Sequence, residues 1–312
     1  MGTRSHLREL VDPELLVLVG VPLDELADVV AQLAPRDHQR AEPGASTDLV
    51  VRSDHLVPGD PPVPVRVHRP RGVGGMRPCV YSIHGGGYIA GSHDDHDPLF
   101  ERWCPMFGCV GVAVDYRLAP ATPYPGPLED CYAGLVWTWE HADELGVDRD
   151  RIGVMGGSAG GGLAAALALL CRDRQGPPLA FQLLECPMLD DRQITPSSRL
   201  EDLPVWSRAS NAFGWQAHLG ELHGTDDVPY TAAPARAVDL SGLPPAFVAV
   251  GAVDGFRDED VDYATRLNQA GVPTELHVYP GGLHGYQLVP GARLTQRAQR
   301  ITEEWLAQRL ER

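Results

Sequence analysis

Short runs of apolar, mostly β-branched residues recur along much of the chain, and each is bounded by glycine, proline or polar residues. Such runs predict strands that are buried on both faces, because a strand covered on both sides need not alternate apolar with polar positions. Six of them lie at residues 79–83, 110–116, 151–156, 181–186, 246–251 and 275–280. Helix-like segments lie between most of them, at about 98–107, 127–145, 158–174, 258–270 and 291–310. This alternation predicts an α/β fold with a mostly parallel, doubly wound sheet.

Three segments depart from this rhythm. Residues 63–70, VPVRVHRP, alternate valine with polar residues or proline, which predicts a half-buried strand at an edge of the sheet. Residues 1–45 are polar, with helical patches at 13–19 and 23–33, and we expect them to be an appendage to the core domain of residues 46–312. Residues 187–240 contain no clear strand, so we expect an insertion that lies beside the sheet as a lid or cap.

Composition and charge narrow the classes of partner. The formal net charge of −16 argues against nucleic acid and against anionic membrane surfaces, both of which attract clusters of lysine and arginine. Six cysteines are scattered without C-x-x-C spacing, and we expect them to be reduced, buried thiols. The N-terminal residues lack the apolar core of a signal peptide, and no apolar run is long enough to span a bilayer. We therefore expect a cytoplasmic protein.

The first chemical motif follows the third of the six runs. In IGVMGGSAGGG, Gly156-Gly157-Ser158-Ala159-Gly160 matches G-x-S-x-G, the pattern of a serine held on a sharp turn from strand to helix. The helix that begins there offers unpaired N–H groups and the positive end of its dipole. Glycine-rich turns of this kind also bind phosphates, but no lysine follows as in a phosphate-binding loop. The motif therefore predicts that Ser158 is a nucleophile.

The second motif, HGGGY, follows the first of the six runs. Three consecutive glycines are costly to order, so they indicate a place where bare backbone must approach something closely. A serine nucleophile that attacks a carbonyl needs N–H groups aimed at the developing oxyanion. We assign these donors to Gly86, Gly87 and Ala159, with Gly85 shaping the turn. We expect His84 to brace this loop by hydrogen bonding.

A serine nucleophile also needs a base and an orienting acid, which follow it in the order acid, then histidine. Asp254 comes just after the run at 246–251, and His284 lies in the loop after the run at 275–280. Both should therefore lie at the carboxyl edge of the sheet, beside Ser158. We expect His277, which alternates within its strand, to be structural. The competing acids are expected to form the solvated first turn of a helix, and they are Asp258, Glu259, Asp260 and Asp262.

Together these motifs resemble those of the hormone-sensitive-lipase-like esterases of the α/β-hydrolase superfamily. The resemblance rests on HGGG (84–87), DYRLAP (115–120), GGSAGG (156–161), DLSGLPPAFVAVGAVDGFRDE (239–259) and HGY (284–286). It implies an α/β-hydrolase fold and a carboxylesterase that acts on short- to medium-chain acyl esters, with a Ser158, Asp254 and His284 triad. It also implies a cap built from helices of residues 1–45 and the insertion at 187–240, and a homodimer formed through the C-terminal edge of the sheet. The chain departs from the family at Gly157, where an acidic or hydroxyl residue is usual, and at Gly255-Phe256, where Pro-Leu is usual.

The expected reaction passes through an acyl-enzyme: His284 accepts the Ser158 proton, and water then releases the acid. It needs no metal or organic cofactor. Two other classes of function stay open. One is a different enzyme that uses the same site: an amidase, a thioesterase, or a lyase or dehydratase of a natural-product pathway. The other is a non-catalytic receptor for a small molecule. Residues 93–97, HDDHD, are either metal ligands or the start of a helix. Candidates for an acyl pocket, which could equally be the core of the cap, are Tyr88, Trp206, Phe213 and Trp215.

Overall fold

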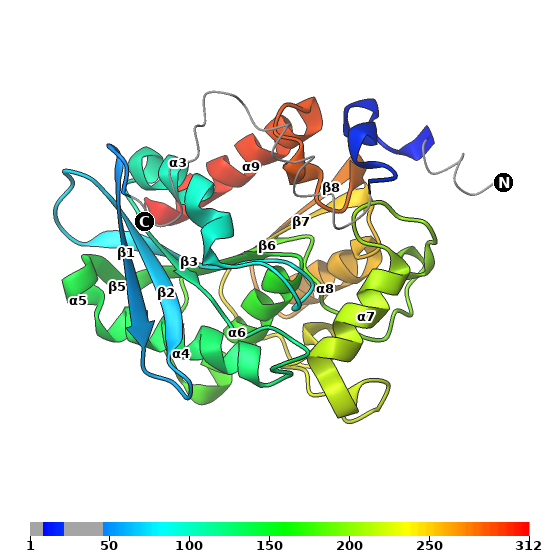
Figure 1. The fold of residues 1–312 in the computed structure, drawn as a ribbon, viewed down its shortest axis with the longest axis horizontal. Helices are drawn as coiled ribbons and strands as arrows, with labels where there is room; N and C mark the ends of the chain where they lie inside the picture. The colour runs from blue at the N-terminus through cyan, green and yellow to red at the C-terminus, as the bar shows by residue number, and fades with distance from the viewer. Residues whose placement is uncertain (1–8, 22–45, 312) are drawn as a thin grey trace.

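A computed structural model describes residues 9–21 and 46–311, in which helices surround a central β-sheet (Figure 1). The described residues form an eight-stranded sheet in the order β1-β2-β4-β3-β5-β6-β7-β8. Its strands are β1 (Val50–Val57), β2 (Val63–Pro70), β3 (Arg77–Ile83), β4 (Val110–Val114), β5 (Val147–Gly157), β6 (Gln182–Glu185), β7 (Ala246–Val253) and β8 (Thr274–Leu283). The first two strands form an antiparallel hairpin, and β2 also runs antiparallel to β4. All the other pairs are parallel, so the predicted α/β fold with a mostly parallel sheet is confirmed.

Helices cover both faces of the sheet (Figure 1). Helices α3 (Asp97–Phe107) and α9 (Arg293–Leu310) pack on one face, where Met155, Leu183 and Phe247 stand side by side on β5, β6 and β7. On the other face lie α4 (Gly126–Glu140), α5 (Ala142–Leu145), α6 (Ala159–Arg174) and α8 (Arg257–Gln269). The central strands are therefore buried on both sides, as their unbroken apolar runs predict.

The remaining elements are short, apart from one helix. Between β6 and β7, the insertion holds α7 (Arg208–Leu219) with the 3-10 turns η3 (Ser197–Arg199), η4 (Gly220–Leu222) and η5 (Pro234–Arg236). Three further 3-10 turns are η1 (Pro13–Leu18), η2 (His93–His96) and η6 (Tyr286–Leu288). None of the helices in the described residues is both long and apolar enough to span a bilayer.

The prediction of an edge strand at 63–70 is wrong in one respect. Strand β2 lies between β1 and β4, so β1 forms this edge of the sheet. Arg66 and His68 of β2 are buried, and Asp97 accepts hydrogen bonds from Arg66 at 3.1 Å and from His68 at 2.8 Å. Paired charges can be buried in this way, whereas the alternation of apolar and polar residues alone suggests contact with solvent.

The N-terminal residues that the structure describes pack on the sheet domain. Leu15 and Leu18 of η1 are fully buried in the cluster that also contains α9, and the Asp12 N–H donates to Gly281 O at 2.9 Å. The second expected helical patch, at 23–33, lies outside the described residues, so the N-terminal contribution to a cap stays a prediction. All six cysteines are buried free thiols, as expected.

Candidate active site

Ser158 stands on the sharp turn between β5 and α6. Its φ of 56° and ψ of −123° lie in a region that residues with side chains rarely adopt. Two backbone hydrogen bonds hold it there, from Ser158 N–H to Glu185 O at 2.9 Å and from Met188 N–H to Ser158 O at 2.9 Å. The neighbouring strand and the loop after it thus fix the strained residue and expose its hydroxyl at the carboxyl edge of the sheet.

The two flanking glycines of the G-x-S-x-G motif are required by close contact. A Cβ at Gly156 would lie 2.2 Å from the carbonyl oxygen of Gly160, and a Cβ at Gly160 would lie 2.1 Å from that of Ile83. Both distances are far below van der Waals contact, and both partners are backbone atoms that cannot rotate away. Any side chain at either position would push α6 off the ends of β3 and β5.

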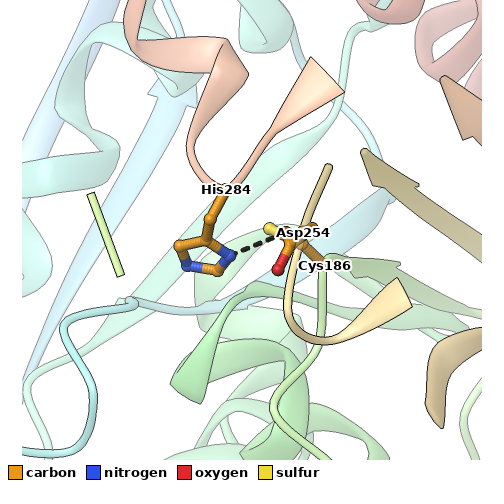
Figure 2. Close-up of side chains that lie close together, drawn as sticks. All are labelled: Cys186, Asp254 and His284. Atoms are coloured by element: carbon orange, nitrogen blue, oxygen red, sulfur yellow. Dashed lines mark hydrogen bonds and ion pairs between the residues drawn. The ribbon is translucent and has the colours of Figure 1, made fainter. Parts of the chain in front are cut away.

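Ser158, His284 and Asp254 form a continuous hydrogen-bonded chain. His284 Nε2 lies 3.0 Å from Ser158 Oγ, and His284 Nδ1 lies 2.8 Å from Asp254 Oδ2. Figure 2 shows the bond between His284 and Asp254. The Phe256 N–H donates to Asp254 Oδ1 at 3.0 Å, and the Phe256 ring meets the imidazole edge to face at 5.1 Å. The Phe256 N–H therefore fixes one carboxylate oxygen of Asp254, and the other oxygen orients His284.

The electrostatics of His284 are dominated by two opposing effects. Burial lowers the pKa of His284, but the carboxylate of Asp254, with Cys186 beside it, raises that pKa well above the usual histidine value. The exposed fraction of His284 is 7% and that of Asp254 is 2%, so solvent screens this pair little. The ring is thus a stronger base than a free imidazole.

The glycine loop, residues 84–87, lies against the serine turn. Gly86 has a φ of 106°, and a Cβ there would lie 2.1 Å from Ala90 O. The N–H groups of Ile89 and Ala90 both donate to Gly86 O at 3.0 Å, which closes a tight turn. A Cβ at Gly85 would lie 3.0 Å from Gly157 O. The loop and the serine turn therefore meet backbone to backbone.

His84 lies behind this loop. Its Nδ1–H donates to Gly85 O at 2.8 Å, and its ring stacks on Tyr116 with centroids 4.1 Å apart. The Tyr116 hydroxyl donates to His84 O at 3.0 Å. Burial lowers the pKa of His84, so the ring is neutral at pH 7. These contacts connect His84 to the loop backbone and leave it outside the hydrogen-bonded chain of Ser158.

The four candidate pocket residues occupy different environments. The Trp206 ring presses on the glycine loop, since a Cβ at Gly87 would lie 2.1 Å from Trp206 Cη2, and its centroid is 6.5 Å from that of His284. Tyr88 and Trp215 are buried, and their rings lie 5.5 Å apart. Phe213 is 55% exposed. Of the four, the structure brings Trp206 next to both His284 and the glycine loop.

The residues of HDDHD start a helix and bind arginine. Ser92 and Asp95 form a reciprocal capping box at the start of η2. Asp94 and Asp97 both accept hydrogen bonds from Arg66. These contacts match the start of a helix rather than a set of metal ligands. In the described residues, the group of His, Cys, Asp and Glu side chains close enough to share a metal ion lies elsewhere.

That group includes a residue that the motifs do not indicate. Cys186 follows β6 directly, and ligand atoms of Cys186, Asp254 and His284 lie within 4.8 Å of one another (Figure 2). The sequence assigns Cys186 no role beyond that of a buried thiol. Like Asp254 and His284 it comes just after a strand, but a single cysteine at such a position has no distinctive spacing.

The prediction that the acids after Asp254 are solvated is wrong for two of them. Glu259 is 2% exposed and Asp260 is fully buried, whereas the carboxylates of Asp258 and Asp262 reach solvent. The first turn of α8 faces the insertion, and the N–H groups of Leu189 and Asp190 donate to Glu259 Oε1 at 2.9 and 3.1 Å. Burial, followed by neighbouring acidic groups, raises the pKa of Asp260 well above its usual value.

Known proteins are similar to this one over nearly the whole chain. Residues 80–288 match the Abhydrolase_3 family, described as an alpha/beta hydrolase fold. The chain is 42% identical to the carboxylesterase NlhH of Mycobacterium tuberculosis over 227 residues, which are 72% of this chain and 71% of NlhH. It is 41% identical over 212 residues to the esterase LipI of the same organism, covering 67% of this chain and 65% of LipI. A solved bacterial heroin esterase superposes with a TM-score of 0.87 at 39% identity, covering 97% of this chain and 98% of that one.

Proposed function

The chain belongs to the Abhydrolase_3 family of the alpha/beta hydrolase fold, and on that basis we propose that Ser158, His284 and Asp254 act as nucleophile, base and orienting acid. The protein is a carboxylic ester hydrolase, as the resemblance drawn from its motifs implies. The observation that carries the proposal is the pair of hydrogen bonds that joins Ser158 Oγ to His284 and His284 to Asp254.

The acylation step follows from these contacts. In the neutral tautomer that donates Nδ1–H to Asp254, His284 has a free lone pair on Nε2, which faces Ser158 Oγ. As Oγ attacks the acyl carbonyl carbon, its proton moves to Nε2, and Asp254 stabilises the imidazolium. The imidazolium then protonates the leaving alkoxide. Water repeats the sequence on the acyl-enzyme and releases the carboxylic acid and free Ser158.

We assign the oxyanion donors to the N–H groups of Gly86, Gly87 and Ala159, with Gly85 shaping the turn. No hydrogen bond within the described residues uses these three N–H groups. Ala159 is the first residue of α6, so its N–H also carries the positive end of the helix dipole. Because backbone donors are fixed before the substrate arrives, they stabilise the charge with little reorganisation.

We propose short- to medium-chain acyl esters as substrates. The support is the position of Trp206, which is 9% exposed and whose ring fills the space next to Gly87. A bulky indole against the oxyanion loop restricts the length of the group that can lie there. The insertion at 187–240, which carries Trp206, would then act as the cap over the catalytic domain of residues 46–312.

Two further proposals concern the setting of the enzyme. We propose a cytoplasmic location, supported by six buried free thiols, since reducing compartments keep thiols unpaired. We also propose a homodimer formed through β8, because within the described residues this strand pairs only with β7 and leaves its other edge free.

Hydrolysis of p-nitrophenyl esters from acetate to palmitate tests the proposed function directly. We expect activity to peak at short or medium acyl chains, and we expect Ser158→Ala to abolish it while the protein stays folded by circular dichroism. A folded wild-type protein that hydrolyses none of these esters would contradict the substrate proposal. Undiminished activity in Ser158→Ala would contradict the assigned nucleophile.

A further inference from the structure

Cys186, Asp254 and His284 combine three different ligand types at one buried point. Their ligand atoms lie within 4.8 Å of one another, and the exposed fractions of the three residues are 4%, 2% and 7%. A thiolate, an imidazole and a carboxylate are the ligands that Zn²⁺ takes, at about 2.3, 2.0 and 2.1 Å respectively. Ligand atoms around one such ion are roughly 3–4 Å apart, so these side chains need only small movements to share it.

The three ligands stand on a rigid support. Cys186 follows β6, Asp254 follows β7 and His284 follows β8, so they lie at the carboxyl ends of three adjacent strands. Cys186 adopts a φ of 38° and its N–H donates to Ala249 O at 2.6 Å on β7. Because the sheet fixes all three backbones, the site is largely formed before any ion binds.

The surroundings of these ligands are acidic. Asp260 is fully buried, and neither of its carboxylate oxygens has a hydrogen-bond partner within the described residues. Burial raises the pKa of Asp260, and the neighbouring Glu259, Asp254 and Cys186 raise that pKa further. No arginine or lysine of the described chain forms an ion pair with Asp254, Glu259 or Asp260. A divalent cation bound here would therefore not compete with a positively charged partner of these carboxyl groups.

We propose that Cys186, Asp254 and His284 form an inhibitory site for a thiophilic divalent cation such as Zn²⁺ or Cd²⁺. The ion takes the lone pair of Nδ1, so the proton of the neutral imidazole resides on Nε2. The Cys186 thiol loses its proton to solvent and binds the ion as a thiolate. An oxygen of Asp254 also binds the ion, which replaces the hydrogen bond between His284 Nδ1 and Asp254. With Nε2 protonated, His284 cannot accept the proton of Ser158. The inhibition, though not the ion binding, rests on the proposed role of His284.

Titration of p-nitrophenyl ester hydrolysis with Zn²⁺ tests the inhibition in three proteins. We expect the wild type and Cys171→Ala to be inhibited equally and to recover with EDTA. Cys171, on α6, is a matched control because it is also a buried free thiol, 5% exposed. We expect Cys186→Ala to need at least about tenfold more Zn²⁺ for the same inhibition. Equal inhibition of all three proteins, or no inhibition of the wild type at millimolar Zn²⁺, would overturn the proposal.

Titration with Cd²⁺ tests the site without catalysis. In Ser158→Ala, which keeps all three ligands, we expect one Cd²⁺ per chain and an ultraviolet charge-transfer band from cadmium thiolate. The band should vanish when Cys186→Ala is added and persist when Cys171→Ala is added. Should Cys186→Ala not fold, Cys186→Ser, which keeps the shape of the side chain but removes the thiolate, is expected to abolish the band in the same way. A band that persists in the variant without Cys186, or the lack of any band in Ser158→Ala, would refute the site. Both outcomes are independent of whether the wild type hydrolyses esters.

Discussion

Gly86→Ala should disable the oxyanion loop, for reasons that the structure makes quantitative. The added Cβ would lie 2.1 Å from Ala90 O, where carbon and oxygen normally keep about 3.2 Å, so the loop must move by about 1 Å. Ala90 O is backbone, so no side-chain rotation relieves the overlap. A displacement of about 1 Å at a catalytic group costs on the order of 10²-fold in rate, and loss of one oxyanion donor costs about 10²–10³-fold.

Gly72→Ala is the matched control for this variant. Gly72 also has a positive φ, of 75°, but a Cβ there has no atom within 4 Å. Both substitutions carry the backbone cost of a left-handed residue, about 1–2 kcal/mol, which lowers the Tm by a few degrees in a protein of this size. Only Gly86→Ala adds the collision, so only this variant should lose activity.

Steady-state kinetics with p-nitrophenyl butyrate, together with thermal unfolding, measure both effects. We expect kcat of Gly86→Ala to fall by about 10²–10³-fold, equivalent to about 2.7–4 kcal/mol of transition-state stabilisation, with KM changed much less. We expect Gly72→Ala to keep the wild-type kcat. A Gly86→Ala enzyme within about threefold of wild type, or an equal loss in Gly72→Ala, would refute this reasoning.

Four other substitutions test the orienting acid, the pocket, the core and one buried histidine. Neutral His284 is the active form and Asp254 raises the pKa of its ring, so activity should already decrease above pH 6.5 as the pH is lowered. In pH-rate profiles, Asp254→Asn should move this decrease to lower pH and should lower kcat by about 10⁴-fold. Trp206→Ala should shift the p-nitrophenyl ester optimum to longer chains, whereas Trp215→Ala, in the fully buried core, should instead lose about 3–5 kcal/mol of stability on urea unfolding. Burial lowers the pKa of His218 to about 3, below the unfolded value near 6.5, so the free energy of unfolding decreases as the pH falls from 6.5 towards 3. Between pH 7 and pH 5, the free energy of unfolding of His218→Phe should decrease by about 2 kcal/mol less than that of the wild type. An equal decrease in both proteins would contradict this.

The parallel core of the fold could be predicted well, because buried parallel strands are unbroken apolar runs. Residues 246–251, expected as a strand, lie within β7, and residues 98–107 lie within α3. The prediction failed where polar side chains are buried in pairs. Strand β2 was placed at an edge because Arg66 and His68 alternate with valine, yet both bind Asp97.

The hydrogen-bonded chain of the site could be inferred from order and position alone, since Asp254 and His284 each follow a strand. The neighbouring Cys186 could not, because a single cysteine after a strand has no distinctive spacing. Burial of Glu259 and Asp260 was also missed. The burial of Glu259 depends on backbone N–H groups of residues 189 and 190, which are about 70 residues away in sequence and are supplied by tertiary structure.

Covalent trapping of the nucleophile tests the central assignment most directly. Diethyl p-nitrophenyl phosphate reacts with an activated serine, releases p-nitrophenolate and leaves a diethylphosphoryl group on the enzyme. Peptide mass spectrometry should locate one such group per chain, on Ser158, with none in Ser158→Ala and much slower labelling in His284→Ala. An adduct on any other residue in an inactivated enzyme, or labelling of His284→Ala at the wild-type rate, would contradict the assignment of Ser158 as a nucleophile activated by His284.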